Sequence, residues 1–237
     1  MMQNQRGLTL IELMIAMLLS ALVILAATQL FTTNQQLFMT QQIASRVMDD
    51  GQLVLRFIGS DMRQAGYSGG ALPSYSGVVF GGAGGSDDGD PSDQVAVRFN
   101  GNQDCQGTVS PTSVTITNLY FVNGNGELMC DGSLSADPVA LVEGVEAMRV
   151  MYGLDMAGDG EIGPIRFMDA TAAQGVSRPV VAIRLAILMA EESNALPVNE
   201  ERTWHVLDRE ITTGKDQVLR RIFTSTFMLR SMDWEQI

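Results

Sequence analysis

An apolar stretch near the amino terminus is long enough to cross a membrane as a helix. From Leu8 to Phe31 the sequence is almost uninterruptedly apolar, and about 20 such residues span the hydrocarbon core of a bilayer. Glu12 is the only charged residue in this stretch, and the next ionisable residue is Arg46. The pattern therefore predicts a transmembrane helix over residues 8–31 that continues into a neutral, Gln- and Thr-rich extension.

The charges on either side of this stretch predict its orientation. Arg6 precedes the apolar residues, whereas Asp49 and Asp50 follow well after them. A cleaved secretory signal has a shorter apolar core and a small-residue cleavage site after it. By the positive-inside rule, the amino terminus is expected in the cytoplasm and the remainder of the chain is expected to be exported.

Glu12 needs an explanation, because a carboxylate within a membrane costs up to about 3 kcal/mol and by default indicates a functional partner. A simpler interpretation is that Glu12 lies near the start of the helix and extends to the lipid headgroups. The residues alone leave both interpretations open.

The helix is predicted to continue to residue 65. Val47, Val54, Ile58, Met62 and Ala65 recur at helical spacing and form one apolar face. Residues 32–65 are therefore expected to form an amphipathic half, in which Gly51 and Gly59 are candidate positions for a bend. The charged residues of this half, which include Asp61, are expected on a solvated face.

A run of strands is predicted after a loop. Residues 66–93 are rich in Gly, Ser, Asp and Pro and indicate a long loop. Residues 94–237 form a β-rich region, with strands expected at 94–99, 113–122, 147–154, 180–190 and 219–230, and a hairpin turn at 123–126. The predicted fold class is α+β: a long amino-terminal helix packed on a mostly antiparallel sheet.

Charge and cysteine content limit the partners and the compartment. The formal net charge of -12 makes nucleic acid an unfavourable partner. Cys105 and Cys130 lie in polar surroundings, which favours one disulfide and an oxidising compartment. Two reduced thiols are the alternative, and zinc is disfavoured because His205 is the only histidine.

Two motifs with chemical potential are incomplete. Asp155, Asp159 and Glu161 resemble the start of a calcium loop, but Ala157 removes one ligand and Arg166 stands where the closing Glu is needed. A hairpin turn without a cofactor is the preferred interpretation, with calcium on those three residues as the alternative. Residues 66–70 have the form G-x-S-x-G but lie after a helix rather than a strand, so no enzyme is predicted.

The segment "RGLTLIEL" resembles the class III signal of type IV pilins and pseudopilins. The resemblance implies that Gly7 ends a leader of residues 1–7 and that prepilin peptidase cleaves after it. Leu8, where the family most often has Phe or Met, is then the N-methylated terminus. It also implies that Glu12 pairs with the amino group at Leu8 of a neighbouring subunit in a filament.

The later sequence resembles PilW-type minor pilins from the leader to about residue 230. Their helix ends in a D-x-R-x-A-G-Y-like run, and a two-cysteine hairpin, an acidic "YG-D" turn and a final R-R-x-F-T-x-T strand follow. The matching residues are Asp61, Arg63, Ala65, Gly66 and Tyr67; Cys105 and Cys130; Tyr152, Gly153, Asp155 and Asp159; and Arg220, Arg221, Phe223, Thr224 and Thr226.

This resemblance implies a minor pilin that primes and assembles a type IV pilus. The expected partners are prepilin peptidase, other minor pilins, the major pilin and a tip adhesin. The protein is expected first in the inner membrane and then in the pilus tip, where it serves twitching motility, adhesion or DNA uptake. The alternatives are a J-type pseudopilin of type II secretion and a membrane-tethered periplasmic binding module.

Overall fold

The computed structural model describes residues 9–68, 78–79, 92–157, 163–194 and 196–229. The chain divides into two units, Met1–Ala44 and Ser45–Ile237. Helix α1 (Leu10–Gln64) begins in the first unit and ends in the second. In the first unit, the described residues from Leu10 onward are all helical.

The part of α1 that belongs to the second unit has the predicted apolar face. Val54, Ile58 and Met62 are fully buried, and so is Ala65, immediately after the helix. The face recurs every three or four residues, which is the spacing of one side of an α-helix. The helical periodicity of the sequence is therefore confirmed here.

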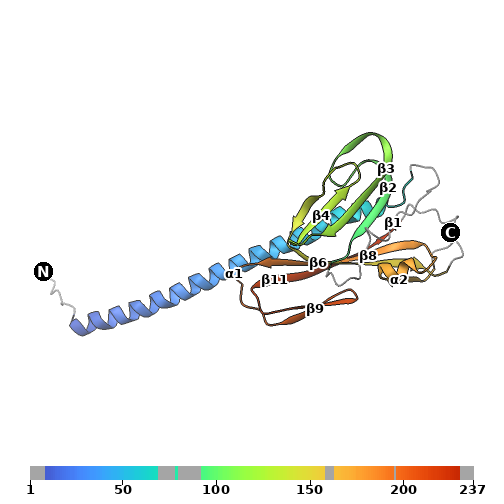
Figure 1. Cartoon of the computed structure of the whole chain (residues 1–237). Coiled ribbons are helices and arrows are strands. Elements are labelled where there is room, and N and C mark those ends of the chain that lie inside the picture. Colours follow the sequence, from blue (N-terminus) through green and yellow to red (C-terminus); the bar gives the residue numbers. More distant parts are fainter. Residues whose placement is uncertain (1–8, 69–77, 80–91, 158–162, 195, 230–237) are drawn as a thin grey trace. The chain divides into compact units, whose positions relative to one another are not determined.

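The described residues of the second unit form three sheets, and all of the strand pairs among them are antiparallel. The first sheet has the order β1-β2-β3-β4-β5, the second has the order β11-β8-β6-β7, and β9 and β10 form a separate hairpin (Figure 1). The fold is α+β, as predicted. The strands are β1 (Val78–Val79), β2 (Val95–Gln103), β3 (Val109–Val122), β4 (Glu127–Gly132), β5 (Val139–Glu143), β6 (Val145–Asp155), β7 (Ile165–Met168), β8 (Val180–Glu192), β9 (Arg202–Val206), β10 (Arg209–Thr213) and β11 (Val218–Met228).

The five strands predicted from the sequence are present, and so is the hairpin that joins β3 to β4. Four further strands and the short helix α2 (Ala170–Gln174) lie outside the predicted segments: β5, β7, β9 and β10. The two-residue strand β1 lies within residues 66–93, where a loop was predicted. Asp169 caps α2, because its carboxylate accepts the N–H of Ala172 at 2.7 Å.

Strand β8 lies inside the second sheet and is buried on both faces. One face consists of the alternate residues from Val181 to Met189, and it is buried throughout. The opposite face is also covered, since Ala186 and Leu188 pack with Val206 of the β9–β10 hairpin. A strand buried on both faces has a nearly continuous apolar sequence rather than an alternation of apolar and polar residues.

Two glycines of α1 allow close packing against β11. A methyl group placed on Gly59 would lie 2.5 Å from Cε1 of Phe227, and one placed on Gly51 would overlap the ring of Phe223. Gly51 and Gly59 are eight residues apart on the helix, a rise of about 12 Å. Phe223 and Phe227 are four residues apart on the strand, about 13 Å. The two spacings match, so each glycine leaves space for one aromatic ring of β11 to pack against the helix backbone. This role of the glycines was not predicted.

Replacing Gly59 with Ala is expected to destabilise the second unit. The added methyl group must displace the Phe227 ring, which costs about 1–3 kcal/mol and outweighs the helix preference of Ala over Gly of about 1 kcal/mol. Chemical denaturation of the full chain in detergent micelles measures the change. Gly124→Ala is the control, because a methyl group there meets no atom within 4 Å. A Gly59→Ala variant as stable as the control would contradict the packing described.

Candidate assembly site

Thr9 and Glu12 form a reciprocal cap at the start of α1. The Thr9 N–H and the Thr9 hydroxyl each donate to Oε2 of Glu12 at 2.9 Å. In return, the Glu12 N–H donates to Oγ1 of Thr9 at 3.4 Å. This T-x-x-E arrangement is a capping box, and it satisfies backbone donors that a helix start otherwise leaves without partners. The motif is visible in the sequence as "TLIE", although it was not among the predicted features.

The capping box gives the Glu12 carboxylate a partner inside its own chain. Among the described residues, the donors to this carboxylate come from Thr9, and both bonds fall on Oε2. A carboxylate with two hydrogen bonds is less costly in an apolar environment than a bare one. Gly7 and Leu8, the predicted cleavage residues, lie outside the described residues.

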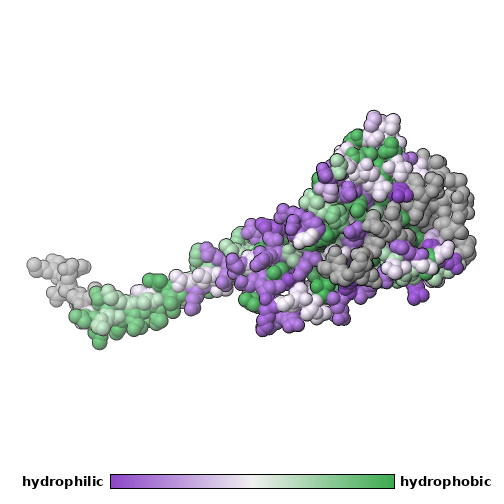
Figure 2. Space-filling view, in the orientation of Figure 1, coloured by the Kyte–Doolittle hydropathy of each residue, from purple (hydrophilic) through white to green (hydrophobic). Residues whose placement is uncertain are grey.

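From Leu10 to Phe31, most of the exposed side chains of the first unit are apolar. Figure 2 shows this surface in green along the amino-terminal part of α1. Within the described residues, α1 is the one helix long and apolar enough to cross a membrane, with a mean hydropathy of 2.6 over 18 residues. The large exposed side chains are Leu10, Ile11, Leu13, Met14, Ile15, Met17, Leu18, Leu19, Leu22, Val23, Ile24, Leu25, Leu30 and Phe31, followed by Leu37, Phe38 and Met39.

The hydroxyl groups along this surface are satisfied within the helix. Ser20 donates to the Ala16 carbonyl at 2.7 Å, and Thr28 donates to the Leu25 carbonyl at 2.8 Å. Because these donors bond back to the helix, they can enter an apolar environment without losing a hydrogen bond. The helix is therefore suited to contact with lipid or with other apolar helices.

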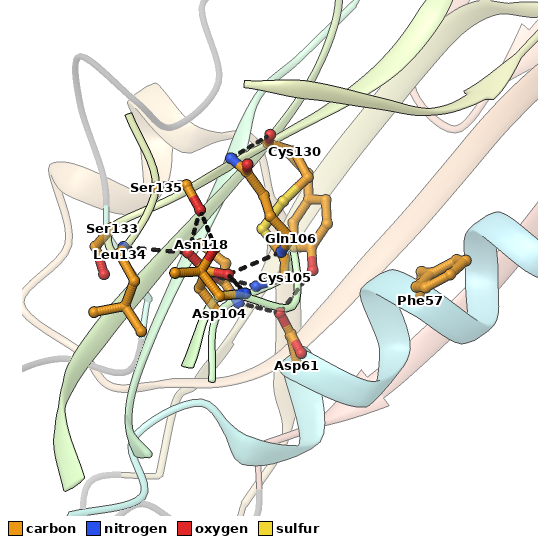
Figure 3. The surroundings of a disulfide bond; sticks show 12 residues. Phe57, Asp61, Asp104, Cys105, Gln106, Asn118, Cys130, Ser133, Leu134 and Ser135 are labelled. Atoms are coloured by element: carbon orange, nitrogen blue, oxygen red, sulfur yellow. Dashed lines mark hydrogen bonds between the residues drawn. A yellow bond between two sulfur atoms is a disulfide. The ribbon is translucent and has the colours of Figure 1, made fainter. Parts of the chain in front are cut away.

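The two cysteines form a disulfide, so the alternative of reduced thiols is wrong. Cys105 follows β2, and Cys130 lies in β4 (Figure 3). The neighbouring Asp104 is buried, and its carboxylate holds the surrounding turns together. The donors to Asp104 are the N–H groups of Gln106, Thr108 and Leu134 and the hydroxyl of Ser135.

Asp61 connects α1 to β3, although the sequence analysis placed it on a solvated face. Its side chain is buried, and its Oδ2 accepts the Asn118 amide at 2.5 Å and the Tyr120 hydroxyl at 2.6 Å (Figure 3). The prediction of a solvated Asp61 is therefore wrong. Its partners lie more than fifty residues away, and helical periodicity carries no information about them.

The acidic turn at 155–161 uses its one described acid for backbone bonds. Asp155 is buried, and its Oδ1 accepts the N–H groups of Ala157 and Gly163, both at 3.0 Å. Asp159 and Glu161 lie outside the described residues. In the part of the chain that the structure describes, no group of three His, Cys, Asp or Glu side chains could hold a metal ion.

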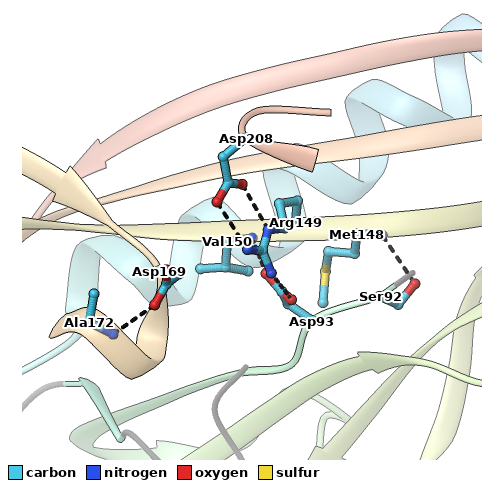
Figure 4. Close-up of polar contacts among 8 residues, drawn as sticks. All are labelled: Ser92, Asp93, Met148, Arg149, Val150, Asp169, Ala172 and Asp208. Atoms are coloured by element: carbon cyan, nitrogen blue, oxygen red, sulfur yellow. Dashed lines mark hydrogen bonds and ion pairs between the residues drawn. The ribbon is translucent and has the colours of Figure 1, made fainter. Parts of the chain in front are cut away.

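Arg149 forms a buried ion-pair cluster that was not predicted, because its partners lie 56 and 59 residues away in the sequence. Its Nη1 donates to Asp93 at 2.6 Å, and its Nε and Nη2 donate to the two oxygens of Asp208 at 2.8 and 3.0 Å (Figure 4). Asp93 also accepts the Val150 N–H at 2.7 Å. The cluster thus joins β6 to the segment before β2 and to the turn between β9 and β10.

The two carboxylates of this cluster have shifted pKa values of opposite sign. The hydrogen bonds from Arg149 hold the pKa of Asp208 below its ordinary value. Burial raises the pKa of Asp93, although the Val150 N–H and the guanidinium act in the opposite direction. Asp208 is a third exposed, so water weakens its share of the interaction.

Two candidates for catalytic chemistry remain, His205 and the G-x-S-x-G segment at residues 66–70. His205 is exposed on β9, with its Nδ1 3.3 Å from Oε1 of Glu210. In the G-x-S-x-G segment, Ser68 follows the end of α1, and the last two glycines lie outside the described residues.

Two family models match the chain. The model of the type IV pilus-assembly protein W matches residues 114–231, and the model of the prokaryotic N-terminal methylation motif matches residues 2–28. The chain is a type IV pilin of the PilW type. The methylation motif includes the Gly7–Glu12 signal, and the PilW match includes Cys130 and the strands from β4 to β11.

A solved structure has the same fold as this PilW-type pilin. A type IV-like pilin from Thermus thermophilus matches 79% of the chain and 98% of its own length, with a TM-score of 0.51 and 18% identity. No curated protein sequence matches the chain significantly. The family and the fold are those of a structural pilin. The signal and the apolar helix fit a membrane-anchored pilin with a soluble carboxyl-terminal domain, and they imply processing by prepilin peptidase and assembly with other pilins.

Loss of the disulfide is expected to destabilise the second unit. The crosslink joins residues 25 apart, and closing a loop of this length contributes about 3 kcal/mol in the chain-entropy model. Chemical denaturation should show this loss for the double variant Cys105→Ala and Cys130→Ala. A reductant should lower the stability of the wild type to a similar value and leave the variant unchanged. A variant as stable as the oxidised wild type would contradict this expectation.

The Arg149 cluster predicts a dependence of stability on pH. Because the pKa of Asp208 is lowered by folding, its contribution is present above its unfolded pKa and is lost as the pH falls through its folded pKa. The stability difference between wild type and Asp208→Asn should therefore be largest near neutral pH and should shrink below about pH 4. Urea denaturation at several pH values measures it, with Asp137→Asn, at an exposed position, as the control. A difference that grows as the pH falls would contradict the assignment.

Proposed function

We propose that this PilW-type pilin is a minor subunit that primes the assembly of a type IV pilus and ends in a complex at the pilus tip. The observation that carries the proposal is an exposed apolar helix that begins within the methylation motif and has a capped carboxylate, Glu12, in its first turn. A helix of this kind needs either lipid or other apolar helices around it. A filament core built from pilin helices supplies the second environment.

Processing prepares the helix start for assembly in this proposal. The peptidase cuts after Gly7, which creates a new amino group at Leu8. Before cleavage, the leader carries Arg6 on the cytoplasmic side, and the second unit is exported to the periplasm. After cleavage, the protein remains in the inner membrane through residues 8–31 until the assembly motor extracts it.

Glu12 then guides docking. The amino group at Leu8 of a neighbouring subunit brings a positive charge to the Glu12 carboxylate, and an ion pair in an apolar environment is stronger than in water. Thr9 holds the carboxylate at the helix start until that amino group arrives. The pair would set the axial position of each subunit that is added.

The tip complex would contain other minor pilins, the first major pilin subunits and an adhesin. A subunit in this position serves twitching motility, adhesion or DNA uptake through its partners. The net charge of -12 favours contact with DNA through a partner rather than directly. Catalysis and a bound cofactor have no part in the proposed mechanism.

Changes at Gly7 and Glu12 test this function in different ways. Gly7→Leu should block cleavage, because the bulky side chain replaces the last leader residue, and surface pili should be lost. Glu12→Ala should be cleaved but should lower the number of pili at least about tenfold, which corresponds to one ion pair worth about 1.4 kcal/mol in docking. Mass spectrometry of the mature terminus and electron microscopy of pili provide the two measurements.

Thr9→Val is the matched control for Glu12→Ala. It removes the two hydrogen bonds of the Thr9 hydroxyl, one donated to the Glu12 carboxylate and one accepted from the Glu12 N–H, but keeps the Thr9 N–H bond to the carboxylate, so piliation should fall much less. Normal processing and normal piliation in both the Gly7 and Glu12 variants would overturn the proposed function.

A further inference from the structure

A groove in the second unit lies between α1, the loop that carries Cys105 and strand β5. Its volume is about 610 Å³, which is within the range of about 300–1,000 Å³ that ligand pockets occupy. Phe57 of α1 and Val139 of β5 form apolar parts of its wall, and they are 42% and 41% exposed. Such side chains leave an apolar surface available to a partner.

The groove also contains two carboxylates. Asp61 and Asp104 both line it, and both are buried. The donors to Asp61 are the uncharged Asn118, Tyr120 and Ser60. None of the described residues that line the groove is Lys, Arg or His. The groove therefore combines negative charge with an apolar wall, and its own lining supplies no positive charge.

The raised pKa of Tyr120, which also lines the groove, is consistent with negative charge there. The pKa of Tyr120 is raised well above its ordinary value, chiefly by burial and then by the charges of Asp61 and Asp104. Tyr120 therefore stays protonated and acts as a donor to Asp61. A positively charged partner group would be attracted to the two carboxylates.

We propose that this groove binds a Lys or Arg side chain of a neighbouring pilin subunit. This inference rests on the proposed function, because it requires a second subunit beside this one. Lys and Arg have an apolar stem and a charged end, so the stem can lie along Phe57 and Val139 while the charge approaches Asp61. Arg can also form several directed hydrogen bonds to one carboxylate.

A bound metal ion is a poorer occupant. A cation such as calcium needs six to eight oxygen ligands at 2.3–2.6 Å. The oxygens of Asp104 already accept four donors, and Phe57 and Val139 offer no ligand. The volume of the groove and its apolar wall both fit a side chain better than an ion.

Gln64 provides a test in which the sign of the charge decides the outcome. It lines the groove at the last residue of α1 and is exposed. In Gln64→Arg, the new guanidinium can occupy the groove from within the same chain and repel a basic partner. Piliation should fall about tenfold, equivalent to about 1.4 kcal/mol in subunit binding. Cleavage of the leader and thermal unfolding should stay at wild-type values.

Gln64→Glu is the matched control, because Glu has the same size as the native Gln and carries a charge opposite to that of Arg. It should leave piliation at or above the wild-type level. The proposal is overturned if Gln64→Arg assembles normally, if Gln64→Glu is the variant that fails, or if both fail equally. The second result would indicate an acidic occupant, and the third would indicate one recognised by shape alone.

A crosslink identifies the occupant directly. Photoreactive p-benzoylphenylalanine in place of Phe57 keeps an aromatic ring at the groove. After irradiation of assembling cells, peptide mapping should locate the crosslink on another pilin subunit within a few residues of a Lys or Arg. A crosslink to a segment without such a residue, or no crosslink, would overturn the proposal.

These outcomes are distinct from failure of the proposed function. If pili form normally in a strain that lacks the protein, the proposed function fails whatever the Gln64 variants do. If that strain lacks pili but Gln64→Arg assembles as the wild type does, the role in assembly stands and the inference about the groove fails.

Discussion

The packing of α1 against two sheets that share no strand is the constraint on which the second unit depends. The rings of Phe223 and Phe227 rest on Gly51 and Gly59, which joins the helix to the second sheet. Asp61 joins the same helix to the first sheet through β3. These contacts come from about the last four turns of α1, and the buried residues of the helix begin at Val47, so the apolar residues before Val47 are not needed for the core of the second unit. The helix can thus serve the fold at one end and assembly at the other.

Three buried carboxylates connect separate segments of the second unit, and each is stabilised in a different way. Asp61 accepts hydrogen bonds from uncharged side chains, Asp104 accepts mostly from backbone N–H groups, and Asp93 accepts from the Arg149 guanidinium. Burying a charge is costly unless it is paired or hydrogen-bonded. The charge of Asp93 is paired with a cation, Arg149, within the subunit. Asp61 has only uncharged donors among the described residues and lies beside a groove, so it can still attract a cation from a partner.

Local patterns in the sequence predicted a large part of the fold, and contacts between distant residues account for what was missed. The apolar face of α1 and the strands β2, β3, β6, β8 and β11 follow from spacing alone. The β9–β10 hairpin was missed because its turn at Leu207 and Asp208 has no Gly or Asn, although Leu207 has a positive φ of 57°. This turn is held from outside, since Asp208 binds Arg149, 59 residues earlier in the chain. The capping box was missed for a different reason: Glu12 was judged by its charge and not by its distance from Thr9.

The capping box changes the energetic problem that Glu12 presents. A carboxylate without donors would oppose insertion of the helix into a membrane, and its first hydrogen bonds would form only on docking. With Thr9 as a donor, part of that cost is already offset in the single subunit. In the proposed assembly, the free energy gained on docking is then only the difference between two donors to Glu12: the charged amino group of the neighbouring subunit and the uncharged Thr9. This smaller difference favours a subunit that is stable in the membrane and still selective for the amino group of its neighbour.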